Sequence, residues 1–352
     1  MSLLSLRLQH FRSYDDADFV FESGVNIIAG RNGSGKTNLL EAVLVIARGQ
    51  SYRAKDVELL SYEAEWARLD GELTDGSRTV KYQTLPLFKK SFDIGGQPLS
   101  RLSLQKTLPV VVFEPNHLML LHGSPDLRRS YLDDVLEQTV PGYGGLRRNY
   151  RRVLAQRNAL LKKGMAIAVP QMFPWDVRLS ELGGQIARQR QSLIEKLQAD
   201  ASTLYEGLAG VTATVDFDYD SQWHAEHYES LMLRKLESNI ETDIQRGFTT
   251  AGPHRDDMFV RLNGQPANIT ASRGETRSIV LLCKVLELRL LESSRQQTPL
   301  LLLDDVFSEL DTTRRHALTG FLEPYQTFLT TTDADMLAKD FSGSVNLVAL
   351  TT

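Results

Sequence analysis

Gly30-Arg31-Asn32-Gly33-Ser34-Gly35-Lys36-Thr37 matches the pattern G-x-x-x-x-G-K-T, and this match decides the fold predicted for the chain. An apolar run at residues 25–29 precedes it and predicts a buried strand, and residues 38–46 follow with apolar residues at helical spacing. Glycines let backbone N–H groups turn toward phosphate oxygens, and a helix N-terminus attracts the same anion. This context favours a phosphate-binding loop over an ordinary glycine-rich turn.

The residue types of this loop predict how it would hold a nucleotide. Lys36 can reach the terminal phosphates, and the Thr37 hydroxyl can hold Mg²⁺. Arg12 lies just beyond the first predicted strand, where it is either a phosphate ligand or a solvated surface arginine. We therefore expect ATP and Mg²⁺ as cofactors. The predicted ATP-binding residues are Arg12, Ser13, Gly30, Arg31, Asn32, Gly33, Ser34, Gly35, Lys36, Thr37 and Asn38.

Composition predicts a packed protein without a membrane span. Apolar residues make up 42% of the 352 residues and charged residues 24%, values typical of a globular core with a charged surface. No apolar run approaches the roughly 18 to 20 residues that a bilayer requires. The single cysteine, Cys283, cannot form an internal disulfide, and we expect a buried thiol in a cytoplasmic protein.

The order of predicted elements indicates an α/β fold with a mostly helical insertion. Strands are expected at residues 3–8, 18–21 and 25–29, and strands and turns at 66–98 predict an antiparallel subdomain. Helical periodicity then dominates residues 124–245, with a break expected at Pro170 and Pro174. We expect an ATPase lobe at 1–123, an inserted helical lobe at 124–247, and the rest of the ATPase lobe at 248–352.

A second motif supplies acidic residues for the same site. Leu300-Leu301-Leu302-Leu303 predicts a buried strand, and Asp304 and Asp305 follow it directly. Such a strand beside a phosphate-binding loop would bring Asp304 to Mg²⁺. Asp305 would stand where a carboxylate can orient or deprotonate a water. An acidic turn in solvent is the alternative, and the loop at Gly30–Thr37 makes it the weaker one.

Residues 271–275 and 308–311 resemble two further motifs of ABC-type ATPases. Ser272 and Glu275 have capping-box spacing at a helix start, and Gly274 permits close backbone approach. The segment resembles a degenerate form of the signature L-S-G-G-Q, from which it departs at Ala271, Arg273 and Glu275. Ser308-Glu309-Leu310-Asp311 resembles a D-loop, although it alone predicts only a capped helix. The resemblance implies that Ser272, Arg273, Gly274, Glu275, Ser308 and Asp311 complete the nucleotide site of a partner copy.

Two features of ABC-type ATPases are weak in this sequence. Thr332 stands where a switch histidine is usual, and no Q-loop glutamine follows residues 110–113. Both departures favour slow hydrolysis, with ATP acting as a timer of assembly.

Positive charge gathers in the predicted insertion, although the net charge of the chain is −4. Residues 141–196 hold eleven Lys and Arg against three Asp and Glu. Such a basic helix face can neutralise DNA phosphates without reading bases, but a solvated helix face is equally compatible with it. For Arg128 and Arg129 a structural ion pair is as plausible as a DNA contact. The candidate DNA-binding residues are Arg128, Arg129, Arg147, Arg148, Arg151 and Arg152, with Arg157, Lys162 and Lys163 beyond them.

Taken together, the chain resembles the RecF family of the SMC/ABC ATPase superfamily. The resemblance rests on residues 10–13, 30–37, 123–133, 156–160, 252–257, 272–275 and 303–311. It implies an ABC/SMC-head-like P-loop fold, a weak DNA-stimulated ATPase, and an ATP-dependent homodimer on double-stranded DNA near single-strand gaps or junctions. It also implies work with RecR and RecO to load RecA, and an Arg12 contact with nucleotide phosphate.

Two other classes of protein share some of these motifs. A transporter ATPase subunit would carry the same loops, but Thr332, the degenerate signature and the basic insertion disfavour it. A structural SMC-type head would need a long coiled coil, and the predicted insertion is short and broken by prolines.

Overall fold

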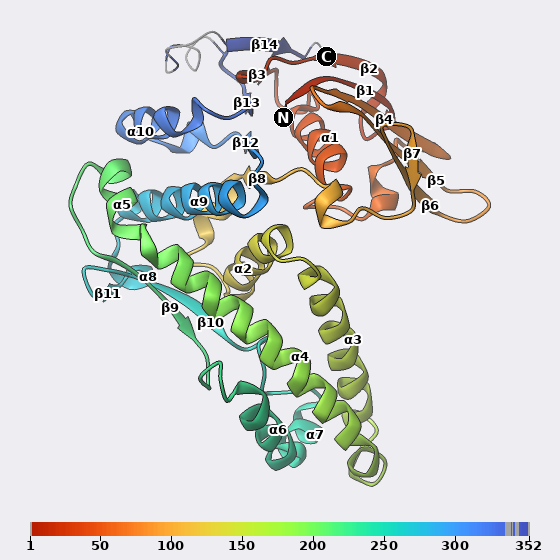
Figure 1. The fold of residues 1–352 in the computed structure, drawn as a ribbon, viewed down its shortest axis with the longest axis vertical. Helices are drawn as coiled ribbons and strands as arrows, with labels where there is room; N and C mark the ends of the chain where they lie inside the picture. Colours follow the sequence, from red (N-terminus) through yellow and green to blue (C-terminus); the bar gives the residue numbers. More distant parts are fainter. Residues whose placement is uncertain (1, 335–338, 340, 342–344, 351–352) are drawn as a thin grey trace. The chain divides into compact units, whose positions relative to one another are not determined.

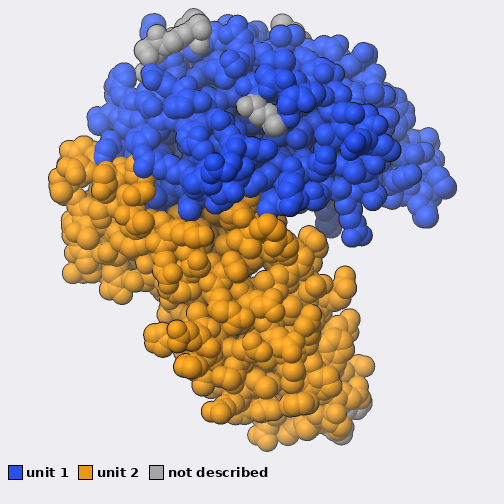
Figure 2. Space-filling model, viewed as in Figure 1, with its two compact units in different colours: residues 1–118, 207–209, 277–352 blue, residues 119–206, 210–276 orange. Residues whose placement is uncertain are grey.

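The computed structural model describes residues 2–334, 339, 341 and 345–350, and the chain divides into two compact units. Unit 1 comprises Met1–Leu118, Gly207–Ala209 and Arg277–Thr352, and unit 2 comprises Met119–Glu206 and Gly210–Thr276. Figure 2 colours the two units separately.

Unit 1 contains two sheets. The first is five-stranded and parallel, in the order β14-β3-β13-β12-β8. The second is six-stranded and antiparallel, in the order β2-β1-β4-β5-β6-β7. The strands are β1 (Leu3–Phe11), β2 (Tyr14–Val20), β3 (Val25–Ala29), β4 (Trp66–Leu73), β5 (Gly76–Gln83), β6 (Lys89–Ile94), β7 (Gln97–Leu99), β8 (Val110–Phe113), β12 (Leu300–Asp304), β13 (Thr327–Thr331) and β14 (Val345–Ala349).

The helix α1 (Lys36–Arg48) holds these two sheets in one core. It contacts β12 and β13 of the parallel sheet and β1, β4 and β5 of the antiparallel sheet (Figure 1). Its apolar residues share one buried cluster with side chains of both sheets, among them Leu6, Leu69 and Leu302. Burial of a Leu or Val side chain contributes about 1.5–3 kcal/mol, so this helix is the main source of cohesion between the sheets. The remaining helices of unit 1 are α10 (Thr312–Leu322), most of α9 (Arg273–Arg295), and the short 3₁₀ turns η1 (Asp56–Leu59), η2 (Leu104–Lys106) and η4 (Phe307–Glu309).

Unit 2 is mainly helical and includes one small sheet. In Figure 1, α3 runs along α4, in agreement with the contacts between the two helices. The sheet is antiparallel, in the order β11-β10-β9. None of the described helices is long and apolar enough to cross a bilayer. The elements of unit 2 are α2 (Pro125–Thr139), α3 (Tyr143–Leu161), α4 (Met165–Ala199), α5 (Ala201–Ala209, of which the last turn is in unit 1), β9 (Val215–Asp220), α6 (Tyr228–Ser238), α7 (Ile240–Arg246), β10 (Asp257–Leu262), β11 (Gln265–Pro266) and α8 (Ala267–Thr270). The 3₁₀ turn η3 (Pro115–Met119) belongs to unit 1 except for its last residue, Met119.

The second boundary between the units differs from the expected one at 247/248. The chain returns to unit 1 at Arg277, after the first turn of α9. Strand β10 causes the difference, because it pairs with β9 and not with either sheet of unit 1. Its register joins Asp257 to Asp220 and Leu262 to Val215. A strand adopts the unit of its hydrogen-bonded neighbour, and the sequence of β10 does not identify that neighbour.

Helix α4 runs through both prolines that were expected to break it. Pro170 and Pro174 lie in its first three turns, where each removes an intrahelical hydrogen bond. Tertiary packing offsets this cost, because Ala168 and Met172 are buried in a cluster with Leu160 and Leu161 of α3. The last part of the helical region expected over 124–245 forms two helices, α6 and α7, with Asn239 between them.

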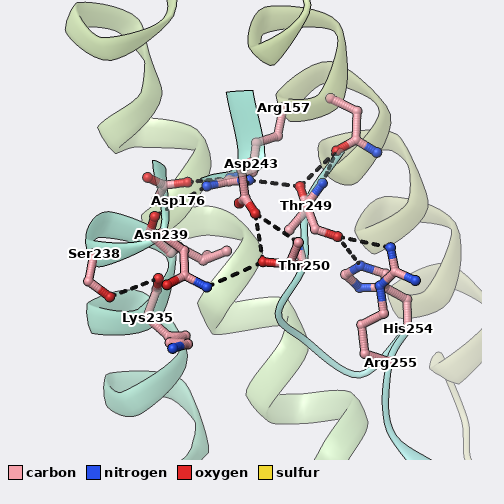
Figure 3. Close-up of polar contacts among 12 residues, drawn as sticks. Arg157, Asp176, Lys235, Ser238, Asn239, Asp243, Thr249, Thr250, His254 and Arg255 are labelled. Atoms are coloured by element: carbon pink, nitrogen blue, oxygen red, sulfur yellow. Dashed lines mark hydrogen bonds and ion pairs between the residues drawn. The ribbon is translucent and has the colours of Figure 1, made fainter. Parts of the chain in front are cut away.

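A buried polar network centred on Arg157 joins the helices of unit 2. The Arg157 guanidinium donates to Asp176 at 2.6 Å and to Asp243 at 2.7 Å, and its side chain is fully buried. It also donates to the Thr249 hydroxyl at 2.8 Å. Figure 3 shows Asp243 continuing the network to Thr250, whose hydroxyl donates to it at 2.6 Å. A buried charge is stable only when it is paired, so Arg157 fixes α3, α4 and α7 to one another.

The segment from Gly252 to Asp257 anchors several elements of unit 2. Tyr150 of α3 lies 2.6 Å from His254 Nδ1, and the buried Arg190 of α4 donates to the Pro253 carbonyl at 2.6 Å. Tyr219 and Tyr228 both donate to Asp256 at 2.8 Å. Burial raises the pKa of Asp256 to about 6, although these hydroxyl groups act against the shift. The segment therefore has a structural role in unit 2, in keeping with the structural turn that its sequence suggested by default.

Candidate functional site

The loop that joins β3 to α1 has the shape that phosphate binding requires. Gly33 and Gly35 adopt left-handed φ angles of 85° and 96°. A Cβ at Gly35 would come within 3.0 Å of Ser13 Oγ and 2.8 Å of the Tyr14 hydroxyl, so only glycine fits there. Lys36 Nζ donates to the carbonyls of Gly30 at 2.7 Å and Arg31 at 3.0 Å, which holds the amine over the loop.

One atom of this loop has no partner among the described residues. Ser34 Oγ is buried and makes no hydrogen bond there. A buried hydroxyl without a partner costs about 1–3 kcal/mol, and a bound phosphate oxygen would satisfy it. The loop residues therefore fit a nucleotide phosphate, which Lys36 and the helix N-terminus would also attract.

The phosphate-binding loop and the acidic end of β12 meet at the carboxyl edge of the parallel sheet. Thr37 Oγ1 donates to Asp304 Oδ1 at 3.1 Å, and Thr330 Oγ1 of β13 donates to the same oxygen at 2.7 Å. A hydroxyl and a carboxylate oxygen are the ligands that Mg²⁺ prefers, with phosphate oxygens and water completing its shell. Thr37 and Asp304 thus fit a nucleotide-bound Mg²⁺. Thr330 was not predicted, because one threonine among several at 327–332 carries no distinguishing signal.

Asp305 is exposed next to this pair. Its backbone has a left-handed φ of 53°, which is unfavourable for a residue other than glycine, and its N–H donates to Thr330 Oγ1 at 2.9 Å. Ser308 Oγ donates to the Asp305 carbonyl at 2.7 Å. The Asp305 side chain is therefore accessible to water. Thr332, at the switch position, follows β13 directly.

Arg12 makes a different contact from the one expected. Its guanidinium donates to both carboxylate oxygens of Glu41, at 2.8 and 3.0 Å, and to the Glu58 carbonyl at 2.8 Å. Arg53 donates to Glu41 at 3.0 Å as well. Burial acts to raise the pKa of Glu41, but the hydrogen bonds from Arg12, Arg53 and Ser51 outweigh it and the net pKa shift is downward. Glu41 is fully buried on α1 and takes up the positive charge of Arg12.

Ser13 and Asn38 lie beside this cluster. Asn38 Nδ2 donates to Ser13 Oγ at 2.9 Å, and Arg53 donates to Asn38 Oδ1 at 2.7 Å. The start of α1 is therefore tied to the β1–β2 turn and to residue 53. Neither Glu41 nor Arg53 was predicted. A glutamate inside the apolar run of α1 was the available signal, because a buried carboxylate requires a cationic partner.

The signature-like and D-loop segments both begin helices with side-chain caps. In unit 2, Ser272 N donates to Glu275 Oε2 at 2.8 Å and Glu275 N donates to Ser272 Oγ at 3.3 Å, so the predicted capping box is confirmed. Ser272 and Arg273 are exposed and Gly274 is half-buried. In unit 1, Asp311 caps α10 by accepting from the Arg314 N–H at 3.0 Å.

Comparison with known proteins places the whole chain in one family. The model of the RecF/RecN/SMC N-terminal domain matches residues 2–349. A DNA replication and repair protein RecF of Natranaerobius thermophilus is 33% identical over 99% of this chain and 95% of its own length. The protein of the same name from Synechococcus sp. (strain JA-3-3Ab) is 37% identical over 94% of this chain and 91% of its own length.

The chain belongs to the RecF family. Its fold agrees with that of a solved recombination mediator protein, RecF-ATPrS of the RecFOR pathway, with a TM-score of 0.87, 26% identity and coverage of 99% of this chain and 97% of that one. The Smc head bound to the C-terminal winged-helix domain of ScpA gives a TM-score of 0.53 at 15% identity, which shows the shared fold alone. The predicted ABC/SMC-head-like α/β class is thereby confirmed.

Several candidate DNA-binding arginines of this RecF-family chain are engaged in structural ion pairs. Arg128 is buried and donates to both oxygens of Asp257, at 2.8 and 2.7 Å. Arg129 donates to Asp126 at 2.6 Å and to the Asp256 carbonyl at 2.8 Å. Arg147 pairs with Asp133 at 3.1 Å and with Glu137 at 2.9 Å. Their contacts, like those of Arg157, fix the fold of unit 2.

The exposed basic surface is smaller than the sequence suggested. Arg148, Arg151 and Arg152 are exposed on α3, and no ion pair of theirs is found among the described residues. Lys162 and Lys163 are exposed after the helix ends. We call these five residues the α3 basic surface. Residues four apart lie on one face of a helix, so Arg148 and Arg152 share a face with Arg151 beside them.

Substitution of a buried, ion-paired arginine and substitution of an exposed arginine of the α3 basic surface should change the free energy of unfolding by different amounts. Arg128→Ala should lower the free energy of unfolding by about 3–5 kcal/mol, because it leaves Asp257 buried without its partner. Arg148→Ala is the matched control and should change it by less than about 0.5 kcal/mol. Urea unfolding of both variants measures the difference. Equal stability of Arg128→Ala and Arg148→Ala would contradict the structural role of Arg128.

Proposed function

We propose that this chain is an ATP-dependent DNA-binding protein of recombinational repair. In this proposal it binds ATP with Mg²⁺, dimerises on double-stranded DNA near single-strand gaps, and acts with RecO and RecR to load RecA. The contact of Thr37 with Asp304 is the observation that carries the proposal, because it joins the loop that would bind phosphate to the carboxylate that would face the metal. The RecF-ATPrS and RecF-ATP proteins, which share this fold, support the choice of nucleotide.

The chemistry of this chain is proposed to be slow ATP hydrolysis. Lys36 would leave its loop carbonyls and bind the terminal phosphates, while Thr37 and Asp304 would hold Mg²⁺, which stabilises the charge that develops on the transferred phosphoryl group. Asp305 would orient the attacking water. Thr332 supplies no ring nitrogen at the switch position, which supports slow turnover that is weakly stimulated by DNA and releases the dimer.

Dimerisation is proposed because the signature-like helix start has an exposed, capped N-terminus. Ser272 and Arg273 are exposed at this end of α9, where backbone N–H groups attract an anion. In ABC-type ATPases this helix serves the nucleotide of the partner copy. Two such sites, each built from two chains, would make assembly dependent on ATP.

Ser272→Arg should prevent this dimer without preventing nucleotide binding by the monomer, because its larger, charged side chain would obstruct only the partner's site. Light scattering with ATPγS should give a monomer for Ser272→Arg and a dimer for the wild type. Ser294→Arg, at an exposed position on the same helix, is the control and should dimerise. A full dimer of Ser272→Arg, or loss of nucleotide affinity in calorimetry, would contradict the proposed role.

The α3 basic surface is proposed to contact DNA phosphates. Arg148→Glu combined with Arg151→Glu should weaken duplex binding at least about tenfold at low salt and lower the slope of log affinity against log salt by about two. The control is Arg234→Glu with Lys235→Glu, which changes the charge equally at exposed positions of α6. Fluorescence anisotropy with a labelled duplex measures both. Equal affinity and slope in the two double variants would place the DNA elsewhere.

The whole-chain match to RecF proteins disfavours the two alternative functions. The RecF proteins of Natranaerobius thermophilus and Synechococcus sp. (strain JA-3-3Ab) match at least 94% of the chain at 33–37% identity. A transporter subunit or an SMC-type head accounts for the nucleotide motifs alone.

A further inference from the structure

Glu114 lies at the same edge of the parallel sheet as Asp304, although no sequence motif marked it. Strand β8 ends at Phe113, and Glu114 is the next residue. The neighbouring strand β12 is parallel to β8, and its register joins Leu303 to Phe113. The residues that follow this pair are Asp304 and Glu114. Neighbouring strands lie about 4.7–4.9 Å apart, so the two carboxylates leave the sheet side by side.

Strand alternation also places the two side chains on one face. Leu303 and Phe113 are both buried, and residues in register on parallel strands share a face. Asp304 and Glu114, one step further, therefore share the opposite face, and both are half-buried. The contact of Thr37 with Asp304 identifies it as the face toward the phosphate-binding loop.

The electrostatics of neighbouring groups agree with this placement. The pKa of Glu114 is raised, first by burial and then by the charge of Asp304, although Lys284, Arg53 and a side-chain hydrogen bond with Asn116 act against the shift. Burial, followed by the charges of Asp304 and Glu114, raises the pKa of Tyr52. Two carboxylates held together in a half-buried site repel one another, and a divalent cation between them relieves that repulsion.

We propose that Glu114 is a metal-facing carboxylate of the nucleotide site, at the position where the sequence lacks a Q-loop glutamine. The inference rests on the proposed function, because the metal is the one that accompanies the nucleotide. Thr37, Asp304 and Glu114 would then offer Mg²⁺ a hydroxyl and two carboxylates, directly or through bound water. An amide would offer a neutral oxygen instead. Because ligand charge tunes the affinity for hard cations, the carboxylate should strengthen the coupling between metal and nucleotide.

The test measures how much a metal ion improves nucleotide binding. Calorimetry gives the affinity for ATPγS with and without Mn²⁺, and the ratio of the two affinities is the coupling between metal and nucleotide. We expect this ratio to fall about tenfold in Glu114→Gln, with the affinity for metal-free ATPγS unchanged. Glu72→Gln, an exposed carboxylate on β4 of the same unit, is the matched control and should keep the wild-type ratio.

The result that overturns the inference is a wild-type ratio in Glu114→Gln. Thermal unfolding of each variant without nucleotide confirms that it is folded, and Glu114→Ala tests the position with a side chain that has no oxygen. Glu114→Ala should lower the ratio of the ATPγS affinities with and without Mn²⁺ at least as much as Glu114→Gln does. If the chain does not bind nucleotide as proposed, the result is different. The wild type would then bind ATPγS neither with nor without Mn²⁺.

Discussion

The contact between Thr37 and Asp304 is the interaction on which the candidate nucleotide site of unit 1 depends. Thr37 lies in the first turn of α1, the helix packed between both sheets, and Asp304 ends strand β12, which lies between β13 and β8. Parallel pairing brings the carboxyl ends of β3, β12, β13 and β8 to one edge, so the phosphate-binding loop and the acidic residues converge there. Ligands of open α/β sheets bind at that edge. The fold thus brings Thr37 and Asp304, which are 267 residues apart in the sequence, together at one polar edge of the sheet.

Burial of charge organises unit 2 in a different way. Arg128, Arg147, Arg157 and Arg190 are paired with carboxylates inside the unit. Arg128 and Arg190 also join its helices to the segment at Gly252–Asp257. Removing either member of such a pair leaves an uncompensated buried charge, which is strongly destabilising. Of the basic residues at 141–196, Arg157 and Arg190 are buried and Arg147 is half-buried, whereas the others are exposed. The part left for an external anion is the α3 basic surface, which is compact enough to be tested with two substitutions.

Local patterns predicted much of this structure, and long-range pairing explains the rest. The strand at 25–29 was predicted with its observed bounds, because a short apolar run defines it. The partner of β10 was not predictable, and the return to unit 1 was placed too early. Helical spacing also suggested that Arg147 and Arg157 were exposed, because periodicity defines a face but not what packs against it. Glu114, Thr330 and Glu41 became visible only through the neighbours that the fold gives them.

A crystal structure of the chain with Mg²⁺ and ATPγS tests the account most directly. We expect the metal between Thr37 and Asp304, the terminal phosphates above the loop, and Lys36 Nζ turned from the Gly30 and Arg31 carbonyls to those phosphates. Ser34 Oγ should then have a phosphate partner. Nucleotide bound elsewhere, or Lys36 still held by the two carbonyls beside a bound nucleotide, would contradict it.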